Sequence, residues 1–262
     1  MNDFRQRAGV IVTGAVGNIG ADVTRRLAAD GFAVYMIDQH RDKLEAMTAE
    51  IEGRGGRAAG VVADVRSRAE IDDAVKDARQ RFGRVDALVH IVGHSGSRRI
   101  TAIDKITDEH WHELIELNLT STFNVCRAVI PMMLAQRYGR IVNFSTSGAN
   151  GTRSPVSGTR LPYITAKAGV VGLTRQVALD YAEQGITANL ILPGLVMGKP
   201  GTRIRQMWES NMTREQIEAV FSMFPHNRPA EPDEVAAAVS FFVSPDASYI
   251  NGQILRIDGG KN

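Results

Sequence analysis

The stretch Gly9-Val-Ile-Val-Thr13-Gly14-Ala-Val-Gly17-Asn18-Ile-Gly20 decides the fold of this 262-residue chain. A short β-branched run leads into a glycine-rich turn, and a segment with helical periodicity follows it. Glycine permits a tight turn, lets the backbone approach a pyrophosphate, and allows close helix–strand packing. The free N–H groups and the positive dipole end of the helix then face the phosphates. This pattern predicts a dinucleotide-binding turn. The expected cofactor contacts are Gly14, Gly17, Asn18, Ile19 and Gly20.

Short apolar runs alternate with helix-period segments along the rest of the chain. Further strands are expected at 32–38, 57–63, 85–92, 140–145, 187–192 and 253–257, and longer helices at 67–82, 108–138 and 162–183. The strands are nearly continuous apolar runs, which is typical of a sheet covered on both faces. Repeated strand–helix units predict an α/β fold with a doubly wound parallel sheet of Rossmann type and about seven strands. Since no linker or internal repeat interrupts the pattern, one domain over residues 1–262 is expected.

Two segments, 148–161 and 197–232, do not follow the alternation. Loops longer than about 12–15 residues in a compact α/β domain are usually functional lids or binding loops. Both segments follow strands at their carboxyl ends, where ligands of such sheets bind. We therefore expect them to be substrate loops.

Composition excludes several classes of partner. Lys and Arg total 31 against 29 Asp and Glu, a net charge of +2, so neither nucleic acid nor an anionic membrane is expected as the main partner. The lone Cys126 cannot form an internal disulfide, and no apolar run is long enough to span a membrane. These features predict a cytoplasmic protein that acts on a small molecule.

Acidic residues end the second and third expected strands. Asp38 closes Val34-Tyr-Met-Ile-Asp38, where a carboxylate can accept hydrogen bonds from both ribose hydroxyls of NAD and repels a 2′-phosphate. NAD is therefore expected rather than NADP. Asp64, followed by Val65, ends the next strand, and both are candidate cofactor contacts. Asp64 can face the adenine or cap the helix that begins near Ser67, and the sequence leaves both open.

Tyr163-Ile-Thr-Ala-Lys167 is the most informative chemical motif. Pro162 suits the first turn of a helix, so Tyr163 and Lys167 are expected on one face at i and i+4. A free tyrosine has a pKa of about 10, and a nearby ammonium favours its phenolate. We expect Tyr163 to be the acid/base and Lys167 to lower its pKa and to donate to a ribose.

A hydroxyl cluster, Asn143-Phe-Ser145-Thr146-Ser147, closes the fifth strand. Its side chains are expected at the carboxyl edge of the sheet, level with the cofactor. A hydroxyl there can polarise a carbonyl or hold an alcohol while Tyr163 exchanges its proton.

The combination resembles the short-chain dehydrogenase/reductase superfamily over essentially the whole chain. The matching parts are Thr13-Gly14…Gly20, Asp38, Asp64, Gly93, Asn118, the hydroxyl cluster, Tyr163…Lys167, Pro193-Gly194 and Asp258-Gly259-Gly260. The resemblance implies hydride transfer between a nicotinamide and an alcohol or ketone, usually in a homotetramer. It also implies that Asn118 holds a water in a proton relay, that Gly93, Pro193 and Gly194 lie at the cofactor, and that Val196 meets the carboxamide through its backbone.

The chain departs from the superfamily pattern at several positions. Asn18 stands where glycine is usual, and His90-Ile-Val-Gly93 replaces the usual Asn-Asn-Ala-Gly. His90 is expected to be a packed core residue. The catalytic serine position aligns with Thr146, which is slightly favoured over Ser145 and Ser147 as the hydroxyl partner.

Basic and aromatic residues of the loops are substrate candidates. They are His94, Arg98, Arg153, Arg160, Arg203 and Trp208. One hypothesis is that an arginine binds an anionic substrate group, and the alternative is that these are solvated loop charges beside a packed lid. No metal site is expected, because His110 and His112 point to different sides of a helix.

The sequence thus predicts an NAD-dependent oxidoreductase for a sugar, polyol or cyclic secondary alcohol, anionic ones included. Two alternatives remain open. One is a carbonyl reductase of the 3-oxoacyl thioester type, and the other is a nucleotide-sensing protein that has lost turnover.

Overall fold

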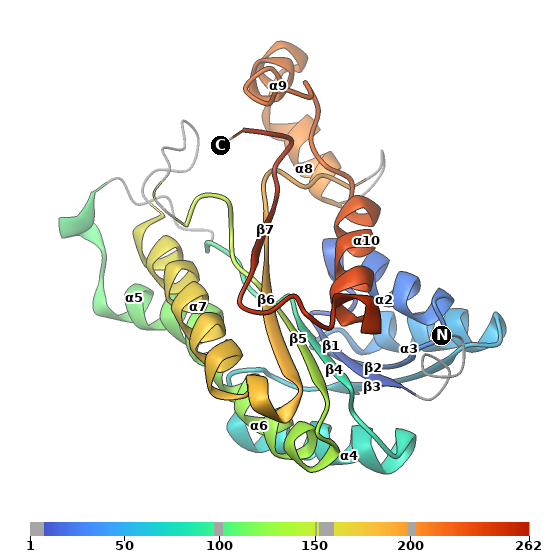
Figure 1. Cartoon of the computed structure of the whole chain (residues 1–262). Helices are drawn as coiled ribbons and strands as arrows, with labels where there is room; N and C mark the ends of the chain where they lie inside the picture. The colour runs from blue at the N-terminus through green and yellow to red at the C-terminus, as the bar shows by residue number, and fades with distance from the viewer. Residues whose placement is uncertain (1–7, 97–101, 150, 152–159, 199–202, 262) are drawn as a thin grey trace.

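A computed structural model describes residues 8–96, 102–149, 151, 160–198 and 203–261. Seven strands in this part of the chain form a single sheet in the order β3-β2-β1-β4-β5-β6-β7 (Figure 1). All neighbouring strands are parallel. They are β1 (Gly9–Thr13), β2 (Ala33–Asp38), β3 (Arg57–Val62), β4 (Ala87–His90), β5 (Gly139–Phe144), β6 (Ile186–Pro193) and β7 (Ile254–Ile257). The predicted doubly wound parallel sheet is confirmed.

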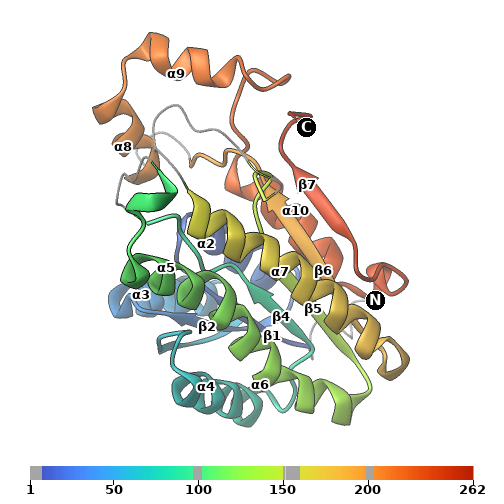
Figure 2. The same cartoon turned by 90° about the vertical axis from the view of Figure 1, so that its left-hand side faces the viewer.

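Helices cover both faces of the sheet. One face carries α2 (Asn18–Ala29), α3 (Arg41–Gly53) and α10 (Pro232–Val243), and the other carries α4 (Arg68–Phe82), α5 (Asp108–Ile115), α6 (Ser121–Gln136) and α7 (Leu161–Asp180) (Figure 2). Two further helices, α8 (Arg203–Asn211) and α9 (Arg214–Phe221), lie beyond the carboxyl ends of the strands (Figure 1). None of the helices in the described ranges is long and apolar enough to cross a membrane.

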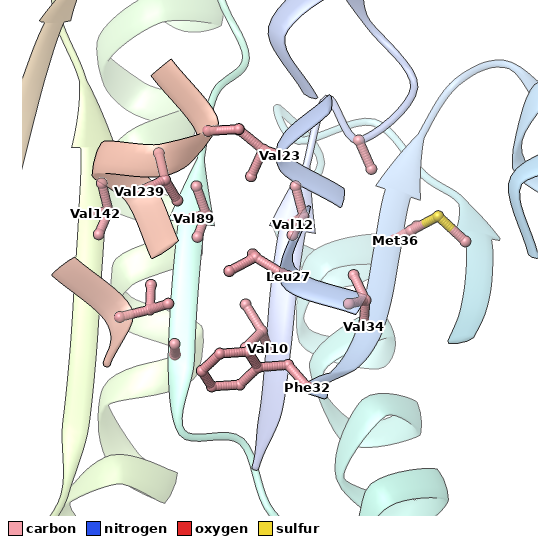
Figure 3. Close-up of a cluster of buried hydrophobic side chains, with 14 of the residues drawn as sticks. Val10, Val12, Val23, Leu27, Phe32, Val34, Met36, Val89, Val142 and Val239 are labelled. Carbon is pink, nitrogen blue, oxygen red and sulfur yellow. The ribbon is translucent and has the colours of Figure 1, made fainter. Parts of the chain in front are cut away.

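The core lies in two layers because successive side chains of a strand point to opposite faces. Val10 and Val12 of β1 pack under Leu27 of α2, in a cluster that also contains Val239 of α10 (Figure 3). Ile11, between the two valines in the sequence, belongs to the opposite layer, under α4 and α6. Burial on both faces explains why the strands lack polar alternation.

The predicted helix over 108–138 is wrong in one respect. It is divided into α5 and α6 by a π-helical turn over Glu116–Thr120, whereas Pro131 lies inside α6. A π turn has i→i+5 hydrogen bonds and is usually found as a single turn inside an α-helix. The expected strand over 85–92 is also shorter, since pairing in β4 ends at His90.

The start of α4 matches the prediction. The Ser67 hydroxyl accepts a hydrogen bond from the backbone N–H of Glu70 at 3.4 Å, so Ser67 is the N-cap. The insertion over 197–232 contains α8 and α9, whose helical content was not predicted. A parallel bridge between Val196 and Ala230 joins the two ends of this insertion.

Candidate active site

A cavity of about 720 Å³ opens at the carboxyl edge of the sheet. It brings together most of the predicted site residues, which come from segments far apart in the sequence. Those lining it are Gly14, Gly17, Asn18, Ile19, Gly20, Asp38, Val65, Gly93, His94, Thr146, Arg160, Tyr163, Lys167, Pro193, Gly194 and Val196. Asp64, Asn118, Ser147 and Trp208 are not among the lining residues. Arg98 and Arg153 lie outside the described residues, and so does the side chain of Arg203.

The glycine turn has the geometry that its sequence predicts. Gly14 has a φ of +66°, and its N–H donates to the carbonyl of Ile37 at 2.8 Å. A Cβ atom at Gly20 would overlap the carbonyl oxygen of Gly14, so no side chain fits there. Gly17 precedes α2 and provides no side-chain cap. Backbone N–H groups at the start of α2 are thus suited to an anion such as a pyrophosphate.

Asp38 lies at the end of β2, beside the glycine turn. One carboxylate oxygen accepts hydrogen bonds from the backbone N–H of Gln39 and from Nδ1 of His40, each at 2.8 Å. The other lies 3.3 Å from the backbone N of Val16. A carboxylate held in this way can still accept from a hydroxyl, since each oxygen has two lone pairs. The glycine turn and Asp38 together fit a dinucleotide, with its phosphates at α2 and a ribose at β2.

Asp64 is held by its neighbour Arg66. Nε of Arg66 donates to the carboxylate at 2.9 and 3.0 Å, and this contact holds the pKa of Asp64 below its usual range. The cap of α4 is Ser67, so Asp64 does not take the capping position that was one of its two predicted roles. Its neighbours Ala63 and Val65 line the cavity instead.

Thr146 is the hydroxyl that contacts the phenol. Its side chain acts on the Tyr163 phenol and lowers the pKa of that phenol, whereas the Ser145 hydroxyl donates to the backbone carbonyl of Lys167 at 2.7 Å. Ser147 is not a lining residue, and its backbone carbonyl accepts from Arg256. Of the three hydroxyls in the cluster, Thr146 is therefore the one placed to act with Tyr163.

The surroundings of Tyr163 and Lys167 shift the pKa values of these two groups in opposite directions. Burial raises the pKa of the Tyr163 phenol, and the groups that oppose this rise are the charged Arg160 and the hydrogen bond from Thr146. Nζ of Lys167 donates to the backbone carbonyls of Phe144 at 3.0 Å and Val92 at 3.3 Å. Burial lowers the pKa of Lys167 to about 8, because the buried ammonium loses its hydration.

Gly93 separates Lys167 from Asn118. It has a φ of +150°, and a Cβ atom there would overlap Oδ1 of Asn118 and lie 2.7 Å from Nζ of Lys167. Asn118 lies in the π turn, is fully buried, and donates to the carbonyls of Leu114 at 2.9 Å and His94 at 3.0 Å. Asn118 therefore packs behind Gly93, which lines the cavity, and is hydrogen-bonded to the loop that follows β4.

His90 is confirmed as a packed core residue. It is buried, with its two ring nitrogens 2.8 Å from the Thr13 hydroxyl and 3.3 Å from the Ser121 hydroxyl. Burial lowers its pKa to about 3, so the ring is neutral at physiological pH.

The substrate candidates separate into those at the cavity and those away from it. The guanidinium carbon of Arg160 lies 5.2 Å from the centre of the Tyr163 ring, and His94 lines the wall after β4. From α8, Met207 lines the cavity and its neighbour Trp208 does not.

The lining also includes His40, Ser95 and Met207, which were not among the individual site candidates, although Ser95 and Met207 lie in loop segments next to those candidates. The position of His40, two residues after Asp38 at the end of a strand, could have indicated that its side chain lies at the cofactor edge of the sheet. Within the described ranges, no three His, Cys, Asp or Glu side chains gather as metal ligands would.

Comparison with known proteins agrees with this geometry. The family model described as enoyl-(acyl carrier protein) reductase matches residues 14–262. The chain is 32% identical over 263 residues to the 7alpha-hydroxysteroid dehydrogenase of Bacteroides fragilis, covering 99% of this chain and 96% of that protein.

Two solved structures share the fold and nearly the full length. Actinorhodin polyketide ketoreductase with NADPH has a TM-score of 0.86 at 32% identity, covering 100% of this chain and 98% of that one. NAD⁺-bound xylitol dehydrogenase has a TM-score of 0.84 at 28% identity, covering 98% and 99%. The chain belongs to the short-chain dehydrogenase/reductase superfamily, and it is an oxidoreductase of a family that uses nicotinamide cofactors.

Proposed function

We propose that the protein is an NAD-dependent oxidoreductase that interconverts a secondary alcohol and its carbonyl compound, with Tyr163 as the acid/base. The observation that carries the proposal is that Thr146 and Tyr163 line one cavity together with the glycine turn, and that Thr146 lowers the pKa of the Tyr163 phenol. A proton donor or acceptor, a second hydroxyl and a dinucleotide cradle are what this reaction requires. Sugars, polyols and cyclic alcohols are the proposed substrates, as for the xylitol and hydroxysteroid dehydrogenases among its relatives.

The proposed chemistry in the oxidation direction moves one proton and one hydride. The Tyr163 phenolate accepts the hydroxyl proton at its oxygen, while the Thr146 hydroxyl holds the substrate oxygen in place. A bound nicotinamide supplies the acceptor for the hydride that leaves the carbinol carbon. In reduction the Tyr163 phenol returns the proton to the carbonyl oxygen, so the site serves both directions.

Lys167 has the hydrogen-bonding capacity for its proposed role at the ribose. An ammonium has three donors, and two of those on Lys167 are directed to the carbonyls of Phe144 and Val92. The third remains for a ribose hydroxyl, on the side where Lys167 lines the cavity. The proposed roles of Asn118 in a water relay, and of Gly93, Pro193, Gly194 and Val196 at the nicotinamide, follow the superfamily pattern.

The preference for NAD rests on Asp38. A carboxylate at this strand end disfavours a 2′-phosphate by charge repulsion. Its relatives do not decide the matter, because one neighbouring structure holds NADPH and another holds NAD⁺. The proposal therefore depends on a residue of this chain.

A second candidate is reduction of a 3-oxoacyl thioester. It is favoured by the polyketide ketoreductase among the neighbours and by the acyl-carrier description of the matching family. The site chemistry would be the same, with Tyr163 as the proton donor. NADPH would be the usual cofactor of that reaction, and Asp38 argues against it.

The testing experiment is a two-direction screen of the purified protein. NAD⁺ reduction is followed with neutral and acidic sugars, polyols and cyclic alcohols, and NADPH oxidation is followed with acetoacetyl-CoA. Turnover in the first arm that depends on Tyr163 supports the proposal. Turnover in the second arm alone supports the thioester reductase, and binding of NAD without turnover in either arm supports a nucleotide sensor.

We also propose that residues 1–262 form one domain and that the protein assembles as a homotetramer in the cytoplasm. Exposed apolar side chains such as Phe123 on α6 and Leu179 on α7 are available for contacts between copies. Light scattering of the purified protein tests the assembly, since a monomeric mass contradicts it.

A further inference from the structure

Arg160 occupies a distinctive place beside the proposed acid/base. It is the residue that precedes α7, three positions before Tyr163. Residues three apart at the start of a helix lie on the same side, and here the guanidinium carbon is 5.2 Å from the Tyr163 ring centre. Both residues line the cavity. A positive charge is thus placed directly against the ring that is proposed to exchange the proton.

This charge has no carboxylate partner within the described residues. Nε of Arg160 is buried and finds no hydrogen-bond acceptor there, and no ion pair of Arg160 is found among the described residues. By contrast, Arg205 is paired with Glu209 at 2.9 Å, and Arg228 with Glu234 at 2.6 Å. The adjoining residues 148–159 contain no Asp or Glu, so this stretch of sequence supplies no acidic partner either.

Arg160 is partly buried, but an N–H group that is itself buried without an acceptor, as its Nε is, is costly, and a ligand that supplies an acceptor removes the cost. Guanidinium presents two parallel N–H groups that match the two oxygens of a carboxylate. Since Arg160 lies against the Tyr163 ring, an anion bound to it would be only a few bonds from the carbon that Tyr163 serves. The short distance between Arg160 and Tyr163 therefore favours a small hydroxy acid as the substrate over a molecule whose anionic group lies at the end of a long chain.

We infer that Arg160 is a specificity-determining residue that binds a carboxylate of the substrate, so that the enzyme prefers hydroxy acids and their keto acids to neutral alcohols. The inference rests on the proposed function, because it uses the same cavity and the same acid/base. The inference goes beyond the proposed function because it names the charged group of the substrate and the residue that selects that group.

The test compares each acid with its own amide. The probes are 3-hydroxybutanoate with 3-hydroxybutanamide, and gluconate with gluconamide, which differ in charge but little in size. Each is measured with NAD⁺ as a substrate, and as a competitive inhibitor of any faster substrate from the screen. The proteins are the wild type, Arg160→Met, Arg160→Lys and the control Arg205→Gln, which removes a paired arginine that does not line the cavity.

The readout is the acid-to-amide ratio of kcat/KM or of inhibition constants, because a general loss of activity cancels in this ratio. We expect the wild type to favour one acid by about tenfold or more. Arg160→Met should lose most of this preference through KM, Arg160→Lys should retain part of it, and Arg205→Gln should keep it.

Three outcomes overturn the inference. They are a wild-type ratio near one for both pairs, a ratio that Arg160→Met leaves unchanged, and an equal loss of preference in Arg205→Gln. The proposed function is judged separately, by Tyr163→Phe with whichever substrate turns over. If Tyr163→Phe abolishes turnover and Arg160→Met leaves the ratio unchanged, the inference fails and the proposed function stands.

Discussion

The guanidinium of Arg160 lies over the ring of Tyr163, with 5.2 Å between its central carbon and the ring centre. Lys167, one helical turn after Tyr163, directs its ammonium to two backbone carbonyls instead. The positive charge that favours the phenolate thus comes from the residue before the helix. Arg160 thus acts on the Tyr163 phenol through its charge, whereas the Lys167 ammonium has a donor available for a ligand.

Replacing Tyr163 by Phe removes the proposed acid/base and leaves the glycine turn and Asp38 in place. We expect kcat to fall by about 10²–10⁴-fold, the usual contribution of a positioned acid or base. The affinity for NAD, measured by calorimetry, should change little. Tyr249→Phe is the matched control, because Tyr249 is fully exposed and does not line the cavity. A Tyr163→Phe protein that turns over at the wild-type rate would show that another group moves the proton.

Removing the charge of Arg160 should shift the pH dependence of alcohol oxidation to higher pH. Oxidation needs the phenolate, burial raises the pKa of Tyr163, and Arg160 opposes that rise. In Arg160→Met the pKa of Tyr163 is therefore higher, and activity is lost sooner as the pH falls. The measurement is kcat/KM for a neutral alcohol over the pH range in which the protein is folded. Arg160→Lys keeps a charge and should fall between the two, whereas coincident profiles would contradict the assignment.

The sheet and the glycine turn could be predicted from the sequence because their signals are local. Apolar runs mark buried strands, and the spacing of Gly14, Gly17 and Gly20 marks the tight entry into α2. The π turn over Glu116–Thr120 could not be predicted in this way. Such turns are rare and interrupt an α-helix for a single turn, and the helix-period pattern over 108–138 predicts one continuous helix.

The contacts that the side chains make at the site could not be predicted from the sequence either. The motif places Tyr163 and Lys167 on one face of α7, but packing decides that the ammonium contacts the carbonyls of Phe144 and Val92. Packing likewise selects Thr146 among three adjacent hydroxyls, because Ser145 is engaged with the backbone of α7. Residue types and spacing predict which groups gather, whereas tertiary contacts decide which of them touch.

Replacing Asp38 by Asn should relax the preference for NAD over NADP. The amide keeps an acceptor for a ribose hydroxyl but removes the charge that repels a 2′-phosphate. We expect the NAD-to-NADP ratio of kcat/KM to fall by about tenfold or more, the size of one lost charge contact. Asp42→Asn, an exposed residue of α3 that does not line the cavity, is the control. An Asp38→Asn protein with the wild-type ratio would show that the preference originates elsewhere.

Gly20→Ala and Gly53→Ala should have opposite effects on stability. The first tests a glycine that is required by close packing, and the second tests a glycine that only adds backbone freedom. At Gly20 a Cβ atom would overlap the carbonyl oxygen of Gly14, so the turn must move, at a cost of roughly 1–3 kcal/mol of unfolding free energy. At Gly53, in α3, a Cβ atom meets nothing within 4 Å, and alanine should stabilise the helix by roughly 0.5–1 kcal/mol. Thermal and denaturant unfolding of both variants measure these changes, and NAD affinity should fall only for Gly20→Ala, because only that turn faces the cavity. If Gly20→Ala were as stable as the wild type and bound NAD as tightly, the close approach of α2 to the glycine turn would not be what the cofactor site requires.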